Sequence, residues 1–173
     1  MPDMTIIRPL HASDLEAALA IQVQAYPAFL CEDAAAFASR LALPRSCCLA
    51  AMQGDAMLGY LLAHAWPAAS PPPVGAVLEP APAEVLYIHD LAVTAVGQGS
   101  GIGRQLVERA LATAAGDGLQ QAELIAVEGA APFWERLGFR ETATSPELAR
   151  KVAEYGPAAR WMRRAIPPPG TPL

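Results

Sequence analysis

The sequence predicts a single α/β domain, and three observations support this fold class. The chain has 173 residues, which fits one ordinary domain of about 100 to 200 residues. Segments with the alternation of β-strands are interspersed with segments whose apolar residues have helical spacing. One stretch, 84–116, reads as a strand, a glycine-rich turn and a helix, which is the order that an anion-binding cradle needs. We therefore expect one hydrophobic core and one functional site.

The first helix is predicted by a capping signal followed by helical spacing. Ser13 can cap a helix while Glu16, three residues later, closes a capping box. Pro27 stops the element. The apolar side chains expected on its buried face are Leu15, Leu19 and Val23.

The other elements follow from periodicity and from the residues that interrupt it. Gly54 and Asp55 join two strands in a hairpin, the proline-rich segment 67–82 cannot join a sheet interior, and Gly138 is the expected left-handed C-cap of a short helix. The predicted strands are 4–8, 47–53, 56–66, 85–93, 122–127, 139–142 and 159–166. The predicted helices are 13–25, 32–41, 104–115, 131–137 and the helix-like 146–155. The domain is expected to cover 1–166, with a disordered proline-rich tail at 167–173.

Composition and charge exclude several function classes. The formal net charge is −5, and the basic residues form no stripe apart from Arg160, Arg163 and Arg164, so no nucleic-acid partner is expected. No apolar run approaches the roughly 20 residues that cross a bilayer, and the N-terminus lacks a secretory signal, so we expect a soluble, cytoplasmic protein. The absence of asparagine beside abundant Arg, Ala and Pro suggests a GC-rich bacterial genome. An acidic chain suits a cationic substrate.

The three cysteines, Cys31, Cys47 and Cys48, do not have metal-ligand spacing. Neighbours on a strand point to opposite faces, so Cys47 and Cys48 are expected to be inert buried thiols rather than a pair. No metal cofactor is therefore expected.

The glycine-rich turn is the strongest local signal. Its residues spell QGSGIGR, where glycines allow positive φ and remove the Cβ atoms that would keep a phosphate away from the backbone N–H groups. The dinucleotide fingerprint fails because Arg104 stands where its last glycine belongs, and no Lys followed by Ser or Thr makes it a P-loop. Taken alone, a glycine-rich turn that binds nothing remains the alternative.

The pattern QxxGxG, after a strand ending in LAV and before the helix RQLVERAL, resembles the acetyl-CoA signature of the GNAT N-acetyltransferases. Downstream, APFWERLGF (131–139) is similar to the AxxFYEKLGF segment of that family, and the order of elements fits 4–166. Within the superfamily, YIHDLAV and VEGAAPFWERLGF look most like arylalkylamine N-acetyltransferases. The resemblance implies a mixed, mostly antiparallel sheet of about six to seven strands flanked by about four helices.

The implied activity is acetyl-CoA-dependent N-acetyl transfer, in the EC 2.3.1 class, to the primary amine of a small molecule by direct attack. Two alternatives stay open: acetylation of a protein or peptide, and a noncatalytic acyl-CoA-binding module. The oligomeric state is also open, a homodimer included.

The resemblance places acetyl-CoA along one strand and over the glycine-rich turn. The main chain of three strand residues would pair with the pantetheine arm, the amides of the turn would hold the pyrophosphate, Gln98 would stand at its mouth, and Trp134 would pack beneath the arm. These strand residues are Leu91, Ala92 and Val93, and these turn residues are Gly99, Ser100, Gly101, Ile102, Gly103 and Arg104. For the Arg104 side chain, a solvated position is the alternative.

His89 is the candidate base, because its unperturbed pKa of about 6.5 suits proton removal at neutral pH. Strand alternation places Tyr87 on the same face and Asp90 on the opposite face. In the arylalkylamine enzymes, the positions of Tyr87 and His89 hold two histidines. A core histidine bonded to a carbonyl is the alternative for His89, and His64 is expected to be structural.

Two further expectations concern the leaving group and the acceptor. Trp134 stands where relatives commonly have a tyrosine that protonates the CoA thiolate, and an indole N–H is not an acid in the useful range. The acceptor is expected to contact the loop after the first helix, through Tyr26, Pro27 and Phe29, together with the proline-rich flap. Ordinary core packing of these aromatic residues is the alternative.

Overall fold

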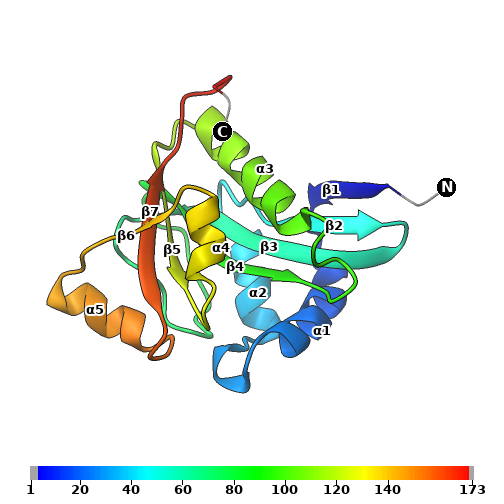
Figure 1. Cartoon of the computed structure of the whole chain (residues 1–173), viewed down its shortest axis with the longest axis horizontal. Helices are drawn as coiled ribbons and strands as arrows, with labels where there is room; N and C mark the ends of the chain where they lie inside the picture. Colours follow the sequence, from blue (N-terminus) through cyan, green and yellow to red (C-terminus); the bar gives the residue numbers. More distant parts are fainter. Residues whose placement is uncertain (1–3, 172–173) are drawn as a thin grey trace.

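The structure, a computed structural model, describes residues 4–171 and is built on one seven-stranded sheet (Figure 1). The strand order is β1-β2-β3-β4-β5-β7-β6, and all neighbours are antiparallel except β4 and β5. The strands are β1 (Thr5–Pro9), β2 (Leu49–Gln53), β3 (Ala56–Trp66), β4 (Val85–Val93), β5 (Gln121–Ala126), β6 (Arg140–Glu141) and β7 (Arg160–Ala165). The fold class predicted from the sequence is therefore confirmed.

Helices cover both faces of the sheet, so each face has its own hydrophobic core (Figure 1). One core joins α3 and α4 to the sheet through side chains such as Leu106 and Trp134, and the other joins α1 and α2 through Ile21 and Phe37. The helices are α1 (Leu15–Ala25), α2 (Ala34–Leu41), α3 (Ile102–Gly116), α4 (Ala131–Arg136) and α5 (Pro146–Ala153), with 3-10 turns η1 (Ala12–Asp14) and η2 (Ala28–Leu30). The described part thus has five α-helices, one more than the four implied by the resemblance.

Strands β4 and β5 pair only at their beginnings. Their partners run from Leu86 with Ala122 to Ile88 with Leu124, and beyond these residues the two strands diverge. Because a parallel ladder ends here, the second half of β4 keeps a row of peptide groups without a strand on that side. The sheet is therefore open in its middle.

A β-bulge lies at the same point of β4. Leu62 on β3 pairs with Asp90 and its neighbour Ala63 pairs with Ile88, so that His89 is one residue extra. A bulge bends the strand and changes the direction of the side chains that follow. It thereby decides which residues of β4 face which side of the open sheet.

The prediction for the start and the buried face of the first helix is partly wrong. The capping box forms between His11 and Asp14, whose Oδ2 accepts the His11 N–H at 2.7 Å, and the first α-helix begins at Leu15 after a 3-10 turn. Asp14 is three residues from His11 and also pairs with Arg8, so it takes the role expected of Glu16. Val23, expected on the buried face, is 69% exposed.

The second helix begins later than predicted. Asp33 caps it, with its carboxylate accepting the Ala36 N–H at 2.9 Å, so Glu32 lies outside the helix instead of in its first turn. Aspartate is among the preferred N-cap residues. The position of Glu32 matters for the site described below.

Two sequence predictions about the chain as a whole have different outcomes. The segment 67–82 contains no strand, as its prolines predicted. The disordered tail stays a prediction, and its residues 172–173 lie outside the described part. No helix within 4–171 combines the length and the hydropathy of a membrane-spanning segment.

Replacing Gly138 by alanine is expected to destabilise the protein by about 1–2 kcal/mol. Gly138 has φ +90°, as predicted for a left-handed C-cap, and an added Cβ would lie 3.3 Å from Arg164 Nη1. Gly116→Ala is the matched control, because Gly116 is helical and open around its Cβ position, so this variant is expected to be neutral or to gain up to about 1 kcal/mol. Urea unfolding measures both, and equal effects would contradict the C-cap interpretation.

Candidate functional site

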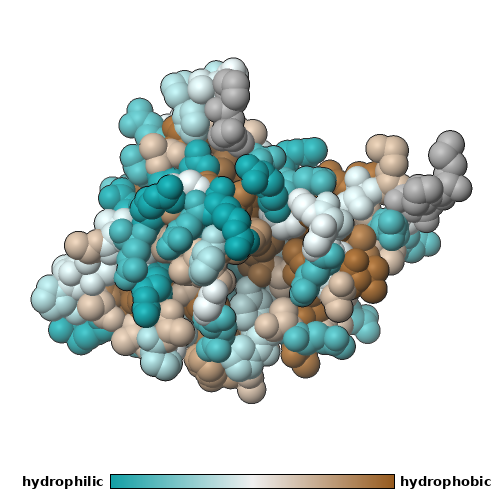
Figure 2. All heavy atoms as spheres, in the orientation of Figure 1, coloured by the Kyte–Doolittle hydropathy of each residue, from teal (hydrophilic) through white to brown (hydrophobic). Residues whose placement is uncertain are grey.

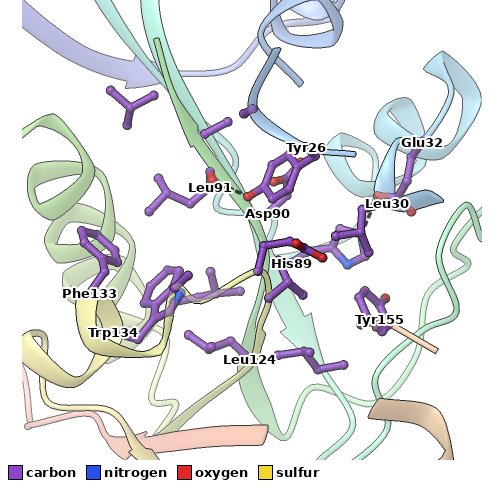
Figure 3. Close-up of a pocket in the computed structure, with 18 of the residues that line it drawn as sticks. Tyr26, Leu30, Glu32, His89, Asp90, Leu91, Leu124, Phe133, Trp134 and Tyr155 are labelled. Atoms are coloured by element: carbon purple, nitrogen blue, oxygen red, sulfur yellow. Dashed lines mark hydrogen bonds and ion pairs between the residues drawn. The ribbon is translucent and has the colours of Figure 1, made fainter. Parts of the chain in front are cut away.

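A cavity of about 390 Å³ passes through the opening between β4 and β5. Its wall includes side chains from both hydrophobic cores, so it connects the α3–α4 face of the sheet with the α1–α2 face. Figure 3 shows Phe133 and Trp134 on one side of β4 and Tyr26, Glu32 and Tyr155 on the other. On the outer surface, Figure 2 shows hydrophobic residues in the recess between α4 and the side that carries α1. Two ligands could thus enter from opposite faces and meet at β4.

The glycine-rich turn presents free amides at the start of α3. Gly101 is the N-cap at φ 81° without a side-chain cap, and the first helical bond runs from the Gln105 N–H to its carbonyl at 3.0 Å. The N–H groups of the first turn before Gln105 have no intrahelical partner for this reason. The amides of Gly97 and Gln98, in contrast, bond to the Thr94 carbonyl. A phosphate cradle would therefore begin after Gln98, as the sequence predicted.

The turn also fits close approach of a ligand. Gly99 has φ +80° with nothing within 4 Å of an added Cβ, so the backbone there is open. Gly103 has a different role, because a Cβ at this position would lie 3.3 Å from the ring of Phe133. Its missing side chain lets α3 pack against α4. The Arg104 guanidinium bonds to Glu108 at 2.9 Å on the exposed surface of α3.

The main chain of β4 offers its groups alternately to β3 and to the cavity. The Thr94 N–H bonds to the Leu58 carbonyl at 2.8 Å, so Ala92, two residues earlier, also faces β3, while Leu91 and Val93 face the opening. The carbonyls of Leu91 and Val93 accept side-chain bonds from Tyr26 Oη at 2.5 Å and Gln98 Nε2 at 3.4 Å. The expected pairing of pantetheine with Ala92 needs correction, because its peptide groups belong to the β3 ladder.

Trp134 and Phe133 form an aromatic wall on the α4 side of the cavity. Trp134 is 7% exposed and makes edge-to-face contacts with Phe133 and Phe139, at centroid distances of 5.0 and 5.5 Å. These contacts fix the indole in place. Trp134 thus lines the cavity as an apolar surface.

His89 belongs to a buried ionic network. Its Nε2 lies 2.7 Å from Glu32 Oε1, and Arg40 Nη2 lies 2.8 Å from Glu32 Oε2; the three side chains are 3%, 4% and 0% exposed. The Gly75 N–H also donates to Glu32, at 2.6 Å. Since Nε2 donates to the carboxylate, Nδ1 of neutral His89 carries the lone pair, and this buried atom has no partner among the described residues.

The protonation of this network follows from burial and charge. Burial and the charge of Arg40 lower the pKa of His89, although the hydrogen bond to Glu32 acts in the opposite direction. Burial would raise the pKa of Glu32, but the hydrogen bond from His89 and the charges of His89 and Arg40 lower it overall. At neutral pH the histidine is therefore a free base beside an ionised glutamate.

His64 and Tyr87 surround the His89 ring. Ring centroids lie 6.5 Å apart for His64 and His89 and 5.8 Å apart for Tyr87 and His89. Burial, followed by the charge of His89, lowers the pKa of His64 to about 3, so His64 stays neutral, in agreement with a structural role. Burial raises the pKa of Tyr87 well above its usual value, so this phenol keeps its proton.

The prediction that Asp90 points away from His89 is wrong. Asp90 Oδ2 accepts the Tyr60 hydroxyl at 2.6 Å, and Tyr60 belongs to the α1–α2 core, the side on which His89 meets Glu32. The bulge is the reason, because two successive side chains at a bulge can share a face. Burial raises the pKa of Asp90 to about 6, although the phenols of Tyr60 and Tyr26 lower it in part.

The α1–α2 side of the cavity, where the sequence predicted the acceptor, contains some predicted residues and some that the sequence did not suggest. Tyr26 lines the cavity, whereas Phe29 is 51% exposed, does not line it and lies beside Gly156. The additional wall residues here are Leu30, Glu32, Val74, Asp90 and Tyr155. Val74 belongs to the proline-rich segment expected to act as a flap. For Glu32, the N-cap preference of Asp33 was the available signal, since it places Glu32 outside the helix.

The described residues do not contain a cluster of three His, Cys, Asp or Glu side chains that could hold a metal ion. Cys47 and Cys48 are buried in opposite cores, as strand alternation predicted, while Cys31 is only partly buried. Burial raises the pKa of the Cys47 thiol to about 11.

Comparison with known proteins identifies the family. The sequence model of a protein family, described as the acetyltransferase (GNAT) family, matches residues 15–139, which is more than half of the chain. No curated protein sequence matches the chain significantly.

Solved structures share the fold over nearly the whole chain. The ribosomal-protein-S18-alanine N-acetyltransferase from Escherichia coli has a TM-score of 0.68 and 20% identity, over 98% of this chain and 99% of that one. Naa50 from Arabidopsis thaliana, in complex with the bisubstrate analogue CoA-Ac-MVNAL, has a TM-score of 0.67 and 17% identity, over 92% of this chain and 97% of that one. Rv2747 from Mycobacterium tuberculosis, in complex with CoA, has a TM-score of 0.68 and 20% identity, over 94% of this chain and 99% of that one. At these identities the likeness establishes the fold.

Replacing Arg40 by alanine is expected to cost about 3–5 kcal/mol at neutral pH, because Glu32 then loses its buried cationic partner. The pKa of Glu32 is lowered in the fold, so this stabilisation is present above the pKa of an unfolded glutamate and is lost as pH falls through the folded value. Urea unfolding at several pH values measures the difference.

Lys151→Ala is the control, since Lys151 pairs with Glu147 at 4.0 Å on the exposed surface, where the cost is expected to stay below about 0.5 kcal/mol. An Arg40→Ala cost that does not exceed the Lys151→Ala cost at neutral pH would contradict the role given to the buried pair.

Proposed function

The chain belongs to the GNAT family of acetyltransferases and uses acetyl-CoA, and from this premise we propose that it acetylates the primary amine of a small molecule. The observation that carries the proposal is that the proline-rich segment is fixed beside the acceptor end of the cavity, where its Val74 forms part of the wall. The segment is held by the Gly75 N–H on Glu32, by the Leu78 N–H on Ser39 and by the Tyr155 hydroxyl on the Pro72 carbonyl. A fixed segment at this end favours a small amine over a polypeptide.

The wall of the acceptor compartment suggests the body of the amine. Tyr26, Tyr87 and Tyr155 line it together with Leu30 and Val74. Aromatic walls favour an apolar or aromatic acceptor body, which supports the arylalkylamine type of substrate. The second candidate, a peptide N-terminus, is favoured by the fold shared with the ribosomal-protein-S18-alanine N-acetyltransferase.

Acetyl-CoA would occupy the α3–α4 side of the cavity. The carbonyl groups of Leu91 and Val93 and the Val93 N–H would pair with the pantetheine arm, and Trp134 would pack beneath it. Gln98 would flank the arm, and the amides from Gly99 to Arg104 would hold the pyrophosphate at the positive end of α3. A carbonyl has two lone pairs, so Leu91 and Val93 can accept a second hydrogen bond beside those from Tyr26 and Gln98.

The proposed chemistry is direct attack of the neutral amine on the thioester carbonyl. His89 would take the amine proton on Nδ1, directly or through water, once the bound acceptor opens access to this buried atom, while Glu32 holds the ring by its Nε2. The Leu91 N–H faces the opening and can donate to the carbonyl oxygen as charge develops there. The carbon–sulfur bond then breaks, and a thiolate with a pKa of about 8.5 can leave without an acid from Trp134.

A thiol-release screen with acetyl-CoA tests this function against polyamines, aryl amines, amino acids, aminoglycosides and peptides. We expect turnover with a small amine, and melting curves that show a larger stabilisation by acetyl-CoA than by NAD or ATP. Turnover with peptides alone would favour the second candidate. Stabilisation by CoA without turnover of any amine would favour a noncatalytic acyl-CoA-binding module, and equal shifts with all three nucleotides would contradict the CoA assignment.

Gly101→Asp is expected to weaken CoA binding at least about tenfold, because a carboxylate at the N-cap competes with the phosphate for the amides and repels it. Gly118→Asp is the matched control, since Gly118 has φ +83° against +81° and also has open surroundings. Both variants should lose similar stability, and only Gly101→Asp should lose CoA affinity, as measured by calorimetry. Equal CoA affinities would remove the turn from the proposed site.

His89→Ala is expected to lower kcat/KM by about 10- to 10⁴-fold, most strongly near neutrality where the acceptor amine is mostly protonated. Because the pKa of His89 is lowered, its ring stays unprotonated into the acidic range. Wild-type activity should therefore fall only below about pH 6.5, the ordinary pKa of a histidine. Higher pH should partly rescue the variant, and its CoA affinity should hardly change. His11→Ala serves as the control. Full activity of His89→Ala from pH 6 to 9 would make His89 structural.

A further inference from the structure

Among the described residues, the cavity wall contains one partly buried carboxylate without a salt bridge. Three acidic residues line the cavity: Glu32, Asp90 and Glu128, and the described wall contains neither lysine nor arginine. Glu32 is paired with Arg40, and Glu128 is exposed. Asp90 accepts a hydrogen bond from the Tyr60 hydroxyl at 2.6 Å, and the phenol of Tyr26 lowers the pKa of Asp90 in part. This hydrogen-bond partner is a neutral group, and no cation among the described residues is in direct contact with Asp90.

A partly buried carboxylate without a cationic partner is costly, because hydrogen bonds from phenols replace only part of its hydration. Such a group is complementary to a cation that enters from outside. An alkylamine with a pKa near 10 arrives almost wholly protonated at neutral pH. The negative charge of Asp90 and the positive charge of a protonated acceptor amine are therefore complementary.

We propose that Asp90, oriented by the hydroxyl group of Tyr60, binds the ammonium group of the acceptor and selects cationic amines over neutral molecules of the same shape. The inference rests on the proposed function, which it deepens by naming the binding group. Asp90 forms the ion pair, and Tyr60 is a positioning residue.

The bulge gives this arrangement its geometry. In a regular strand, His89 and Asp90 would point to opposite faces, and an amine held by one could not reach the other. At the bulge both side chains lie on the α1–α2 side of the sheet, at the point where β4 and β5 part. An ammonium group on Asp90 is thereby held next to the residue proposed to remove its proton.

The pH dependence of binding follows from the groups around Asp90. Burial raises its pKa to about 6, the phenols of Tyr60 and Tyr26 and the charge of Arg40 lower it, and the charge of Glu32 raises it. His89, the chain neighbour of Asp90, stays neutral under the same conditions. Asp90 is then ionised above about pH 6, so ammonium binding is expected to be lost as pH falls through this value.

Binding of simple ammonium salts tests the proposal without knowledge of the natural acceptor. The probes are methylammonium, propylammonium and phenethylammonium chloride, with 2-phenylethanol as the neutral control, titrated by NMR with and without CoA. At pH 8, Asp90→Asn should bind the best ammonium probe about tenfold to a hundredfold more weakly than wild type, with unchanged affinity for 2-phenylethanol and for CoA. The difference should vanish below pH 6.

A second variant separates binding from stability. Tyr60→Phe keeps the ring that packs 5.6 Å from Phe37 but removes one hydrogen bond that lowers the pKa of Asp90, so the pH midpoint of ammonium binding should rise. Since the raised pKa means that ionised Asp90 destabilises the fold above pH 6, Asp90→Asn should melt no lower than wild type at pH 8.

Two results would overturn the proposal. One is that no ammonium probe binds wild type more tightly than Asp90→Asn at pH 8. The other is that Tyr60→Phe leaves the pH midpoint unchanged. Failure of CoA to bind wild type would instead contradict the proposed function, and the ammonium titration without CoA would still decide the role of Asp90.

Discussion

The separation of β4 from β5 after Ile88 is the constraint on which the rest of the site depends. A closed ladder would seal the sheet and leave two cores without a passage between them. Because the strands part, the peptide groups of Leu91 and Val93 are exposed to a cavity instead of to a neighbouring strand, and side chains from both faces reach the same space. The bulge at His89 then places the side chains of His89 and Asp90 at the point of separation.

Glu32 ties three parts of the chain to this opening. It lies between the two N-terminal helices, and its carboxylate receives His89 from β4, Arg40 from α2 and the Gly75 N–H from the proline-rich segment. Its own main chain bonds in both directions to the buried Gln22 side chain of α1. Because both oxygens of this buried carboxylate have partners from separate segments, the loops on this side of the cavity are held in one arrangement.

Much of the fold could be predicted, because local signals and tertiary structure agree there. Strands β3 and β4 begin and end at the predicted residues, since the turn at Gly54 and the prolines of 67–82 mark their limits. The free amides of the glycine-rich turn could also be predicted, because glycine marks where the backbone is open. The acceptor side could not, because it depends on the extra residue in β4 and on loops that meet only in three dimensions. Asp90 and Phe29 were misplaced for this reason: strand periodicity contains no information on a bulge, and an aromatic residue in a loop can pack on either side.

The two carbonyl groups of β4 that face the cavity have a consequence for the chain in solution. An unpaired strand edge can serve as a template on which a strand of another molecule adds, which is a route to aggregation. In this protein the free edge lies inside a cavity, and the carbonyls of Leu91 and Val93 already accept bonds from Tyr26 and Gln98. The walls of the cavity limit intermolecular strand addition at this position, while the second lone pair of each carbonyl stays available to a ligand.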